Sequence, residues 1–299
     1  MMRLAAGVEH LPAADRLRHG RFFKRLQKGD GGFGGREGPS DPYYTSFALR
    51  ALALLGELDE PTARRAADFI RSCQPAEDAA IDMISAVISA AVLDAATGIQ
   101  TIAPVRPWHD AIAAHLDALR CPDGGFAKGR AGAAGSTYQT FLTLVCRQLM
   151  GRPIEAPDAI ATFVRAREVA GGGFLEIRVA KRPGTNPTAA AIGSLKILNS
   201  LDADLAARTR GFLARMQNGE GGFLANSRIP VADLLSTFTT LLTLADLDGL
   251  DTIDRAAARR FVAAREQAGG GFRAAAWDTE CDIEYSFYGL GCQTLLAGL

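Results

Sequence analysis

The string Gly-Gly-Phe occurs five times in this chain, and its spacing constrains the fold more than any other feature. The last four copies are 48, 49 and 49 residues apart. The first interval is 93 residues, close to two periods, which predicts a degenerate copy near residue 77, in the segment SCQPAEDAAID. A regular period of this length is typical of stacked structural repeats. Six repeats of about 48 residues would cover almost the whole chain; the five intact copies lie at residues 31–33, 124–126, 172–174, 221–223 and 270–272.

Every repeat has the same internal order. A Gly-rich turn is followed by a loop, then by an apolar helix, and then by a second helix rich in Arg and Ala. The first helices are expected near residues 42–56, 81–96, 136–150, 187–200, 232–246 and 282–297. The second helices are expected near 60–73, 108–120, 156–168, 203–217 and 252–266, and a helix near 12–27 supplies the missing sixth partner.

The two sets of helices differ in polarity. Segments such as SFALRALALLG and LLSTFTTLLTLA are apolar almost all round, which is typical of helices buried on every side. Segments such as DTIDRAAARRFVAARE have one apolar stripe and one charged face, so we expect them to be half exposed. The pattern predicts an all-α fold, a closed α6/α6 barrel of six helix pairs, formed as one domain over residues 1–299. The paired glycines are expected to adopt positive φ angles in tight turns.

Charge and cysteine usage exclude several classes. Lys plus Arg and Asp plus Glu both number 33, so the net charge is zero and no basic excess favours nucleic acid. No uninterrupted apolar run reaches the roughly 18 residues of a membrane span. The five cysteines are scattered without a CxxC pair, which favours a reducing cytoplasm.

The repeat resembles that of protein prenyltransferase β subunits and of squalene and terpenoid cyclases. The resemblance rests on the Gly-Gly-Phe turns, their period and the paired helices, and it covers nearly the whole chain. It implies an α/α toroid with a funnel-shaped central cavity for an isoprenoid chain. Class II cyclases usually contain two such domains, whereas this chain has room for one, as prenyltransferase β subunits do.

The last two repeats carry the nearest matches to the zinc site of the β subunits. NGEGGFLANSRIPVADLLSTF is similar to the segment with a zinc-binding Asp and Cys, but here Asp233 is followed by Leu235 in the Cys position. CDIEYSFYGLGCQTLL is similar to the segment with the zinc-binding His, which Tyr285 replaces. Zinc needs three or four N, S or O ligands, so the resemblance implies a protein without this zinc site. The DxDD and DDxxD motifs of cyclases and synthases are absent.

Acidic residues at the starts of the apolar helices are the candidates for catalysis. Asp82, Asp233 and Asp282 have two interpretations: they cap helices, or they cluster at one end of the barrel. A cluster would raise the pKa of its members, and it could supply a general acid or hold a divalent ion such as Mg²⁺. The six aligned starts are Pro42, Asp82, Ser136, Pro187, Asp233 and Asp282, with Asp278, Glu280 and Glu284 nearby.

Basic residues in the loops before these helices are the candidates for binding a diphosphate. Guanidinium groups and helix N-termini both favour phosphate oxygens. Lys181, Arg182 and Arg228 are the best candidates, because the fourth and fifth repeats hold the diphosphate in the family. Ordinary solvated loop charge is the alternative interpretation. Aromatic residues for the isoprenoid chain include Tyr138, Trp277 and Tyr285, and the four histidines are expected at the surface.

Three functions remain open at this point. The first is an isoprenoid-handling enzyme that binds a prenyl diphosphate and transfers the prenyl group without zinc. The second is a single-domain class II terpene cyclase that protonates an alkene with Asp82, Asp233 or Asp282. The third is a non-catalytic toroid that binds a lipid or a partner protein. A helical partner subunit and a homo-oligomer are both compatible with the sequence.

Overall fold

A computed structural model describes residues 2–73, 80–101 and 106–297. The chain divides into two compact units: Met1–Trp108 with Val262–Leu299 (unit 1), and His109–Phe261 (unit 2). That residues 1–299 form a single domain stays a prediction. The degenerate repeat expected near residue 77 lies outside the described residues.

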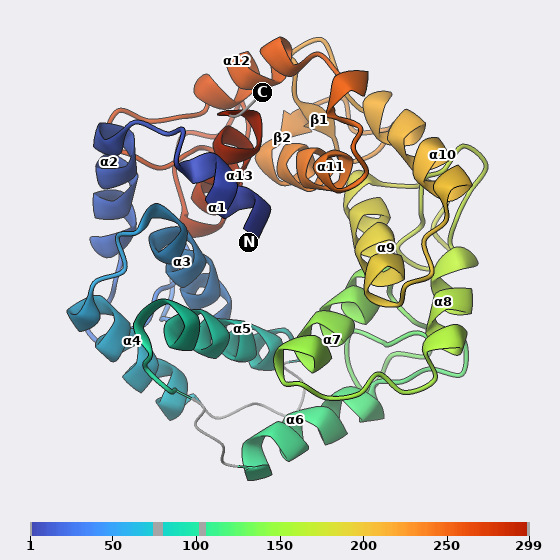
Figure 1. The fold of residues 1–299 in the computed structure, drawn as a ribbon, viewed down its shortest axis with the longest axis horizontal. Helices are drawn as coiled ribbons and strands as arrows, with labels where there is room; N and C mark the ends of the chain where they lie inside the picture. The colour runs from blue at the N-terminus through green and yellow to red at the C-terminus, as the bar shows by residue number, and fades with distance from the viewer. Residues whose placement is uncertain (1, 74–79, 102–105, 298–299) are drawn as a thin grey trace. The chain divides into compact units, whose positions relative to one another are not determined.

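Unit 1 is built around the buried helix α3 (Pro42–Leu55), which packs against α5 (Ala80–Thr97) and α13 (Ile283–Ala297). Helix α2 (Ala13–Lys24) packs against α3, and helix α4 (Glu60–Ser72) packs against α3 and α5 (Figure 1). A short helix that the sequence did not predict, α1 (Met2–Val8), packs on α13 and α3.

Unit 2 repeats the same arrangement. Helix α9 (Thr185–Ile197) packs between α7 (Thr137–Leu149) and α11 (Leu234–Asp246), while α8 (Pro157–Arg165) and α10 (Ala203–Ala214) flank that row (Figure 1). Helices α6 (Arg106–Ala118) and α12 (Arg255–Ala263) run across the boundaries of the units, and a 3-10 turn spans Leu250–Thr252. The two-residue strands β1 (Phe223–Leu224) and β2 (Ala232–Asp233) form the sheet.

A buried hydrogen bond ties each intact Gly-Gly-Phe turn to the apolar helix that follows it. This first helix of a repeat is called the inner helix below, and the second, amphipathic helix is called the outer helix. In every intact repeat the Phe backbone N–H donates to a hydroxyl in the first turn of that helix, and the Phe ring is at most 1% exposed. In four repeats this hydroxyl also donates to the carbonyl of the residue four positions earlier, at 2.6–2.7 Å. The Phe N–H bonds are Phe33 to Thr45 (3.0 Å), Phe126 to Thr140 (3.0 Å), Phe174 to Thr188 (2.9 Å), Phe223 to Thr237 (3.1 Å) and Phe272 to Ser286 (2.9 Å).

The first glycine of each intact turn has a positive φ angle, as predicted, with values between 86° and 91°. At Gly172 (φ 89°) a Cβ would lie 2.3 Å from the backbone carbon of Arg208 on the neighbouring outer helix. Because both the left-handed backbone and this close approach disfavour a side chain, glycine is required there.

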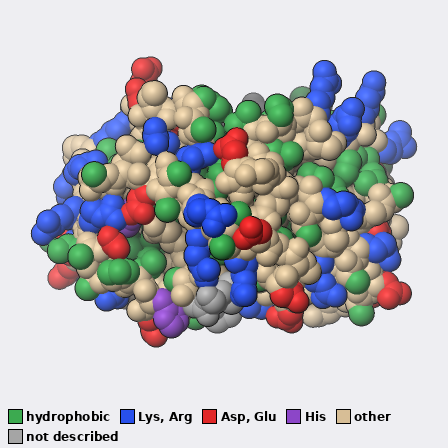
Figure 2. All heavy atoms as spheres, turned by 90° about the horizontal axis from the view of Figure 1, so that it is seen from above, with side chains coloured by type: hydrophobic (Ala, Val, Ile, Leu, Met, Phe, Trp, Pro, Cys, Tyr) green, Lys and Arg blue, Asp and Glu red, His purple; other side chains and the backbone are tan. Residues whose placement is uncertain are grey.

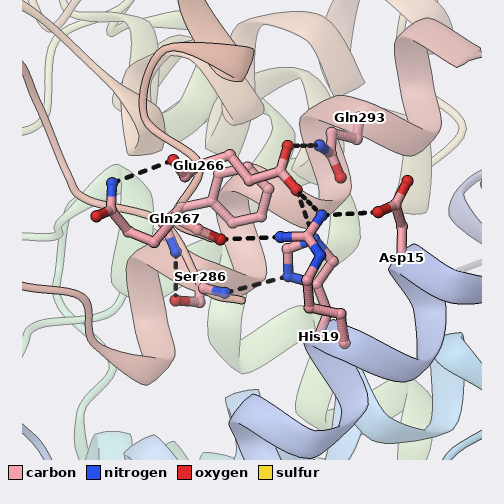
Figure 3. A network of polar contacts seen from close by, with 9 residues as sticks. Asp15, His19, Glu266, Gln267, Ser286 and Gln293 are labelled. Atoms are coloured by element: carbon pink, nitrogen blue, oxygen red, sulfur yellow. Dashed lines mark hydrogen bonds and ion pairs between the residues drawn. The ribbon is translucent and has the colours of Figure 1, made fainter. Parts of the chain in front are cut away.

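The N-terminal helix packs against the last Gly-Gly-Phe turn, as expected of the sixth outer partner. In α2, the His19 Nδ1 atom accepts a hydrogen bond from the Gly271 N–H at 3.1 Å, so His19 Nε2 carries the proton and faces Glu266 Oε1, also at 3.1 Å (Figure 3). The His19 ring stacks on Phe272 at a centroid distance of 5.1 Å. Gln293 Nε2 donates to the other Glu266 oxygen at 2.7 Å.

The expectation that all four histidines lie at the surface is therefore wrong. His19 is 0% exposed and His115 is 8% exposed. The reason lies in the tertiary structure. The buried imidazole of His19 finds two hydrogen-bond partners, Glu266 and Gly271, about 250 residues away in the chain, and these take the place of water.

Helix α5 has a length and an apolar composition that would also suit a membrane span. Among the described residues it is the one helix of 18 or more residues that meets this test. Half of that window is buried, and α5 packs against α3 and α4, as a core helix does. The packing therefore accounts for its apolar character.

Candidate functional site

Two of the three predicted aspartates, Asp233 and Asp282, make the contacts that the capping interpretation predicts. Asp233 Oδ1 accepts from the Ser236 N–H at 2.7 Å, and Asp282 Oδ1 accepts from the Tyr285 N–H at 2.8 Å. Ser136 caps α7 in the same way, and Gly184 occupies this position before α9. Whether these aspartates also act in catalysis stays a prediction.

The sequence alignment of helix starts was wrong at three positions. Pro42 is the first residue of α3 rather than its cap, which is Asp41, whose carboxylate accepts from the Tyr44 N–H at 2.7 Å. Pro187 is the third residue of α9, and Asp82 is the third residue of α5. The missed signal at the first of these was the Asp-Pro pair, since Asp is favoured at the N-cap and Pro at the next position.

Arg36, in the loop of the first repeat, joins two acidic residues of the last repeat. Its Nη1 donates to Asp278 Oδ1 at 2.9 Å, and its Nε donates to Asp282 Oδ2 at 3.1 Å. The hydrogen bond from Arg36 holds the pKa of Asp278 below its usual value, against the effect of burial. Burial raises the pKa of Asp282, although its helix N–H bond and Arg36 oppose the rise. The cation of Arg36 is therefore neutralised.

Glu284, in the first turn of α13, is a mostly buried acid whose carboxylate accepts hydrogen bonds from two tyrosine hydroxyls. Its Oε1 atom accepts from the Tyr43 hydroxyl at 2.7 Å and from the Tyr288 hydroxyl at 3.0 Å. Burial raises the pKa of Glu284, while the two hydroxyl donors and Arg50 oppose the rise. A carboxyl group with a raised pKa is a candidate general acid.

Aromatic rings surround Glu284 on α3 and α13. Phe47 lies 5.0 Å from Tyr43 and 5.4 Å from Tyr288, measured between ring centroids. The predicted binding residue Tyr285 contacts Tyr288 at 5.9 Å, so it lies at the edge of this group. The Arg50 guanidinium stacks over Phe47 at 4.2 Å. The other predicted aromatic residue of unit 1, Trp277, is 73% exposed.

Asp82 lies in the first turn of α5 and belongs to the same unit as Asp41 and Asp282. Burial raises the pKa of Asp82. Burial also raises the pKa of Asp41, with a further contribution from the charge of Asp82. Asp233 is in unit 2, where burial raises its pKa against hydrogen bonds from Ser236 and Leu235. A ring of Asp82, Asp233 and Asp282 thus stays a prediction.

The predicted diphosphate-binding residues lie in two adjoining loops of unit 2. The Thr185 N–H donates to the Ala225 carbonyl at 3.0 Å, which joins the start of α9 to the loop before α11. Arg182 Nη1 lies 3.4 Å from the Oγ atom of Ser227, and Ser227 is the residue that precedes Arg228 in the chain. Among the described residues, no carboxylate forms an ion pair with Lys181, Arg182 or Arg228. The structure brings these three cations into neighbouring loops.

Tyr138, the remaining predicted binding residue, lies at the start of α7 and is 37% exposed. Its backbone N–H is 3.4 Å from Glu176 Oε2, in the loop that carries Lys181 and Arg182. Beyond these loops, the surface is mixed: Lys and Arg side chains alternate with Asp, Glu and hydrophobic ones on the face in Figure 2.

The residues in the family's zinc positions do not fit zinc. The two oxygens of Asp233 bind the Ser236 N–H and the Ser236 hydroxyl, the latter at 2.9 Å, and Leu235 has no donor atom. Across the described parts of the chain, no group of three His, Cys, Asp or Glu residues is placed to hold a metal ion.

The sequence model of the prenyltransferase alpha-alpha toroid domain matches residues 1–82 and 188–299, more than half of the chain. The chain belongs to this family. The mostly helical, paired-helix fold predicted from the repeat is confirmed by this match and by the helices of both units. No curated protein sequence matches the chain.

Solved structures with the same fold include enzymes of different chemistry. Candida albicans protein geranylgeranyltransferase-I, complexed with GGPP, is 17% identical with a TM-score of 0.71, covering 94% of this chain and 90% of that one. A type II terpene cyclase from Scytonema, in complex with geranylgeranyl dihydroxybenzoate, is 14% identical with a TM-score of 0.64, covering 98% and 97%. The GH76A alpha-1,6-mannanase from Salegentibacter sp. HEL1_6 is 10% identical with a TM-score of 0.64, covering 95% and 98%. These likenesses show the fold alone.

Proposed function

We propose that this member of the toroid family binds a prenyl diphosphate and transfers the prenyl group to an acceptor without a zinc ion. The observation that carries the proposal is the pair of adjoining loops with Lys181, Arg182 and Arg228, whose charges no carboxylate in the described residues neutralises. Uncompensated cations beside the start of an inner helix suit a phosphate group, because guanidinium forks and helix N–H groups both donate to its oxygens.

The same residues have a defined part in the transfer. The bond between the prenyl C1 atom and the diphosphate oxygen breaks, and the electron pair leaves with the diphosphate. Cations placed where this negative charge develops lower the barrier. The acceptor supplies the new bond to C1 and loses a proton. Because the site proposed here lacks the ligands for a zinc ion that would activate a thiol, a hydroxyl or amine acceptor is favoured. Tyr138, at the start of α7, is the aromatic residue assigned to the electron-poor C1.

A binding experiment with a matched control tests the diphosphate site. Geranylgeranyl diphosphate should raise the melting temperature of the protein more than geranylgeraniol does, because only the diphosphate reaches the cations. The Arg182→Ala/Arg228→Ala variant should lose that difference. The Arg21→Ala/Arg260→Ala variant, which removes two exposed arginines elsewhere, should keep it. Equal shifts from the alcohol and the diphosphate in the wild-type protein would contradict the proposal.

One observation favours a second function, a class II type of cyclisation in which an alkene is protonated. Glu284 has a raised pKa, takes two tyrosine hydroxyls on one oxygen and lies among aromatic rings. Asp282, by contrast, has its carboxylate paired with Arg36. Incubation with isoprenoids that lack a diphosphate tests this function: turnover that Glu284→Gln abolishes would support it. Binding without any turnover would favour a non-catalytic lipid-binding toroid.

A further inference from the structure

We propose that unit 2 docks on the surface of an anionic lipid bilayer through the three loops before α7, α9 and α11. These loops, residues 127–135, 175–183 and 224–231, are called the loop face below. The loop face includes Lys181, Arg182 and Arg228 of the proposed diphosphate site, but binding to a bilayer needs no isoprenoid ligand, so it can be tested separately from the proposed function.

The three loops form one continuous surface. The Thr137 N–H at the start of α7 donates to the Glu176 carbonyl at 2.9 Å, and Lys128 Nζ lies 3.7 Å from Glu176 Oε1. These contacts join the first loop to the second. The bonds of Thr185 to Ala225 (3.0 Å) and of Arg182 to Ser227 (3.4 Å) join the second loop to the third.

The loop face carries a strong positive charge in a chain whose net charge is zero. Its sequence contains six Lys or Arg residues and one acidic residue, Glu176. Of the six cations, Lys128 alone is close to that carboxylate, and no carboxylate of the described residues pairs with the other five. The six are Lys128, Arg130, Arg178, Lys181, Arg182 and Arg228, and all are exposed.

Exposed hydrophobic side chains lie among these cations. Eight large hydrophobic residues are exposed in the described parts of the chain, and four of them are on the loop face or directly beside it. Val179 is 77% exposed, Ile229 44%, Tyr138 37% and Ile177 36%. The first two are near the tips of their loops, each next to or one residue from a cation.

The corresponding loops of unit 1 show that this is no general property of the repeat. Residues 34–40 and 273–281 contain two arginines and three acidic residues. Arg36, one of the two, is neutralised by Asp278 and Asp282. The same architecture therefore carries acidic loops in one unit and basic loops in the other, although Trp277 of unit 1 is also exposed.

A bilayer fits this combination better than other partners. Anionic headgroups attract clustered Lys and Arg, while isolated aliphatic and Tyr side chains insert at the boundary between headgroups and acyl chains. A nucleic acid would use the cations but would leave Ile177, Val179 and Ile229 exposed to water. The loop face would attach the protein to the bilayer surface and would not cross the bilayer, because its apolar residues are separate side chains on loops.

Cosedimentation with vesicles tests the proposal on the full chain without isoprenoid. We expect binding to phosphatidylcholine vesicles that contain phosphatidylglycerol, weak binding to phosphatidylcholine alone, and loss of binding at high salt. The Arg130→Glu/Arg178→Glu and Val179→Ser/Ile229→Ser variants should each bind about tenfold more weakly or worse. These variants leave Lys181, Arg182 and Arg228 in place, so the diphosphate test is unaffected.

Matched controls separate this face from general charge and hydrophobicity. Arg21→Glu/Arg260→Glu makes the same charge change elsewhere, and Leu17→Ser/Leu149→Ser removes two other exposed leucines. Both controls should bind vesicles as the wild-type protein does. Equal losses in the controls and the test variants would overturn the proposal. So would binding of inorganic diphosphate or single-stranded RNA at these cations with no binding to anionic vesicles.

Discussion

The hydroxyl of Tyr43 donates to Glu284 Oε1 at 2.7 Å and so joins the first inner helix to the last, across 241 residues of chain. Tyr288 donates to the same oxygen at 3.0 Å. The three residues form the polar centre of the aromatic group in unit 1, and the titration of Glu284 should be measurable.

Replacing Glu284 by Gln should change how stability depends on pH. Burial raises the folded-state pKa of Glu284, so its favourable contribution is complete below the unfolded pKa of about 4.3 and is lost as pH rises through the folded pKa. Gln keeps an oxygen for the tyrosines and never ionises. The stability of Glu284→Gln relative to wild type should therefore increase from pH 4 to pH 8 in denaturant titrations. A difference that is constant with pH would contradict a raised pKa.

Removing the Tyr43 hydroxyl tests the hydrogen bond itself. Tyr43→Phe should reduce the free energy of unfolding by about 1 kcal/mol, the usual contribution of one such bond. It should also raise the pKa of Glu284 further, because a hydroxyl donor that favours the ionised form is gone. An unchanged stability together with an unchanged pH profile would argue against the contact.

Replacing Arg36 by Ala should destabilise unit 1. Asp278 and Asp282 are 5% and 9% exposed, and the change leaves both buried carboxylates without their cation. We expect a loss of about 2 kcal/mol, less than for a fully buried pair because Arg36 is itself 33% exposed. Since the pKa of Asp278 is lowered, the contribution is present above the unfolded pKa of about 3.9 and is lost at lower pH. Arg228→Ala, at an arginine that forms no ion pair with a described residue, is the control and should be nearly neutral.

The repeated Phe-to-hydroxyl bond predicts a large effect at Thr188. Its Oγ1 accepts from the Phe174 N–H at 2.9 Å and donates to the Gly184 carbonyl at 2.6 Å, fully buried. Thr188→Val leaves that N–H unsatisfied and should cost about 2 kcal/mol, whereas Thr188→Ser should cost less. The control is Thr162→Val, at an exposed hydroxyl that bonds one helix carbonyl, which should change stability by less than about 0.5 kcal/mol. Thermal unfolding of the four proteins compares them directly.

Variants of Asp233 separate capping from catalysis. If Asp233 only caps α11, Asp233→Asn should leave stability nearly unchanged, because Asn caps about as well as Asp, while Asp233→Ala should cost about 1 kcal/mol. If its carboxylate also acts on a ligand, Asp233→Asn should abolish activity without loss of stability. Measured stability and turnover for both variants distinguish these outcomes.

Much of the fold was predictable because it follows from local regularity. The period of Gly-Gly-Phe determines the repeats, and apolar helices alternating with amphipathic ones determine which set is buried. The positive φ of Gly172 and its equivalents was also predictable, because a tight turn that needs this backbone conformation favours glycine. In the candidate site, the neighbouring positions of Lys181, Arg182 and Arg228 were also predictable from the repeat. These residues lie in equivalent loops of two consecutive repeats, and consecutive repeats pack side by side.

Side-chain partners distant in sequence could be decided only by tertiary structure. Nothing near His19 in sequence shows that it pairs with Glu266, and nothing near Glu284 indicates Tyr43. The neutralised charge of Arg36, as against the unpaired one of Arg228, likewise depends on what a neighbouring repeat presents. A sequence pattern determines which elements form and which face is apolar, since those depend on residues a few positions apart. The surroundings of a charged group depend on packing between repeats, and that packing determines its pKa and what it can bind.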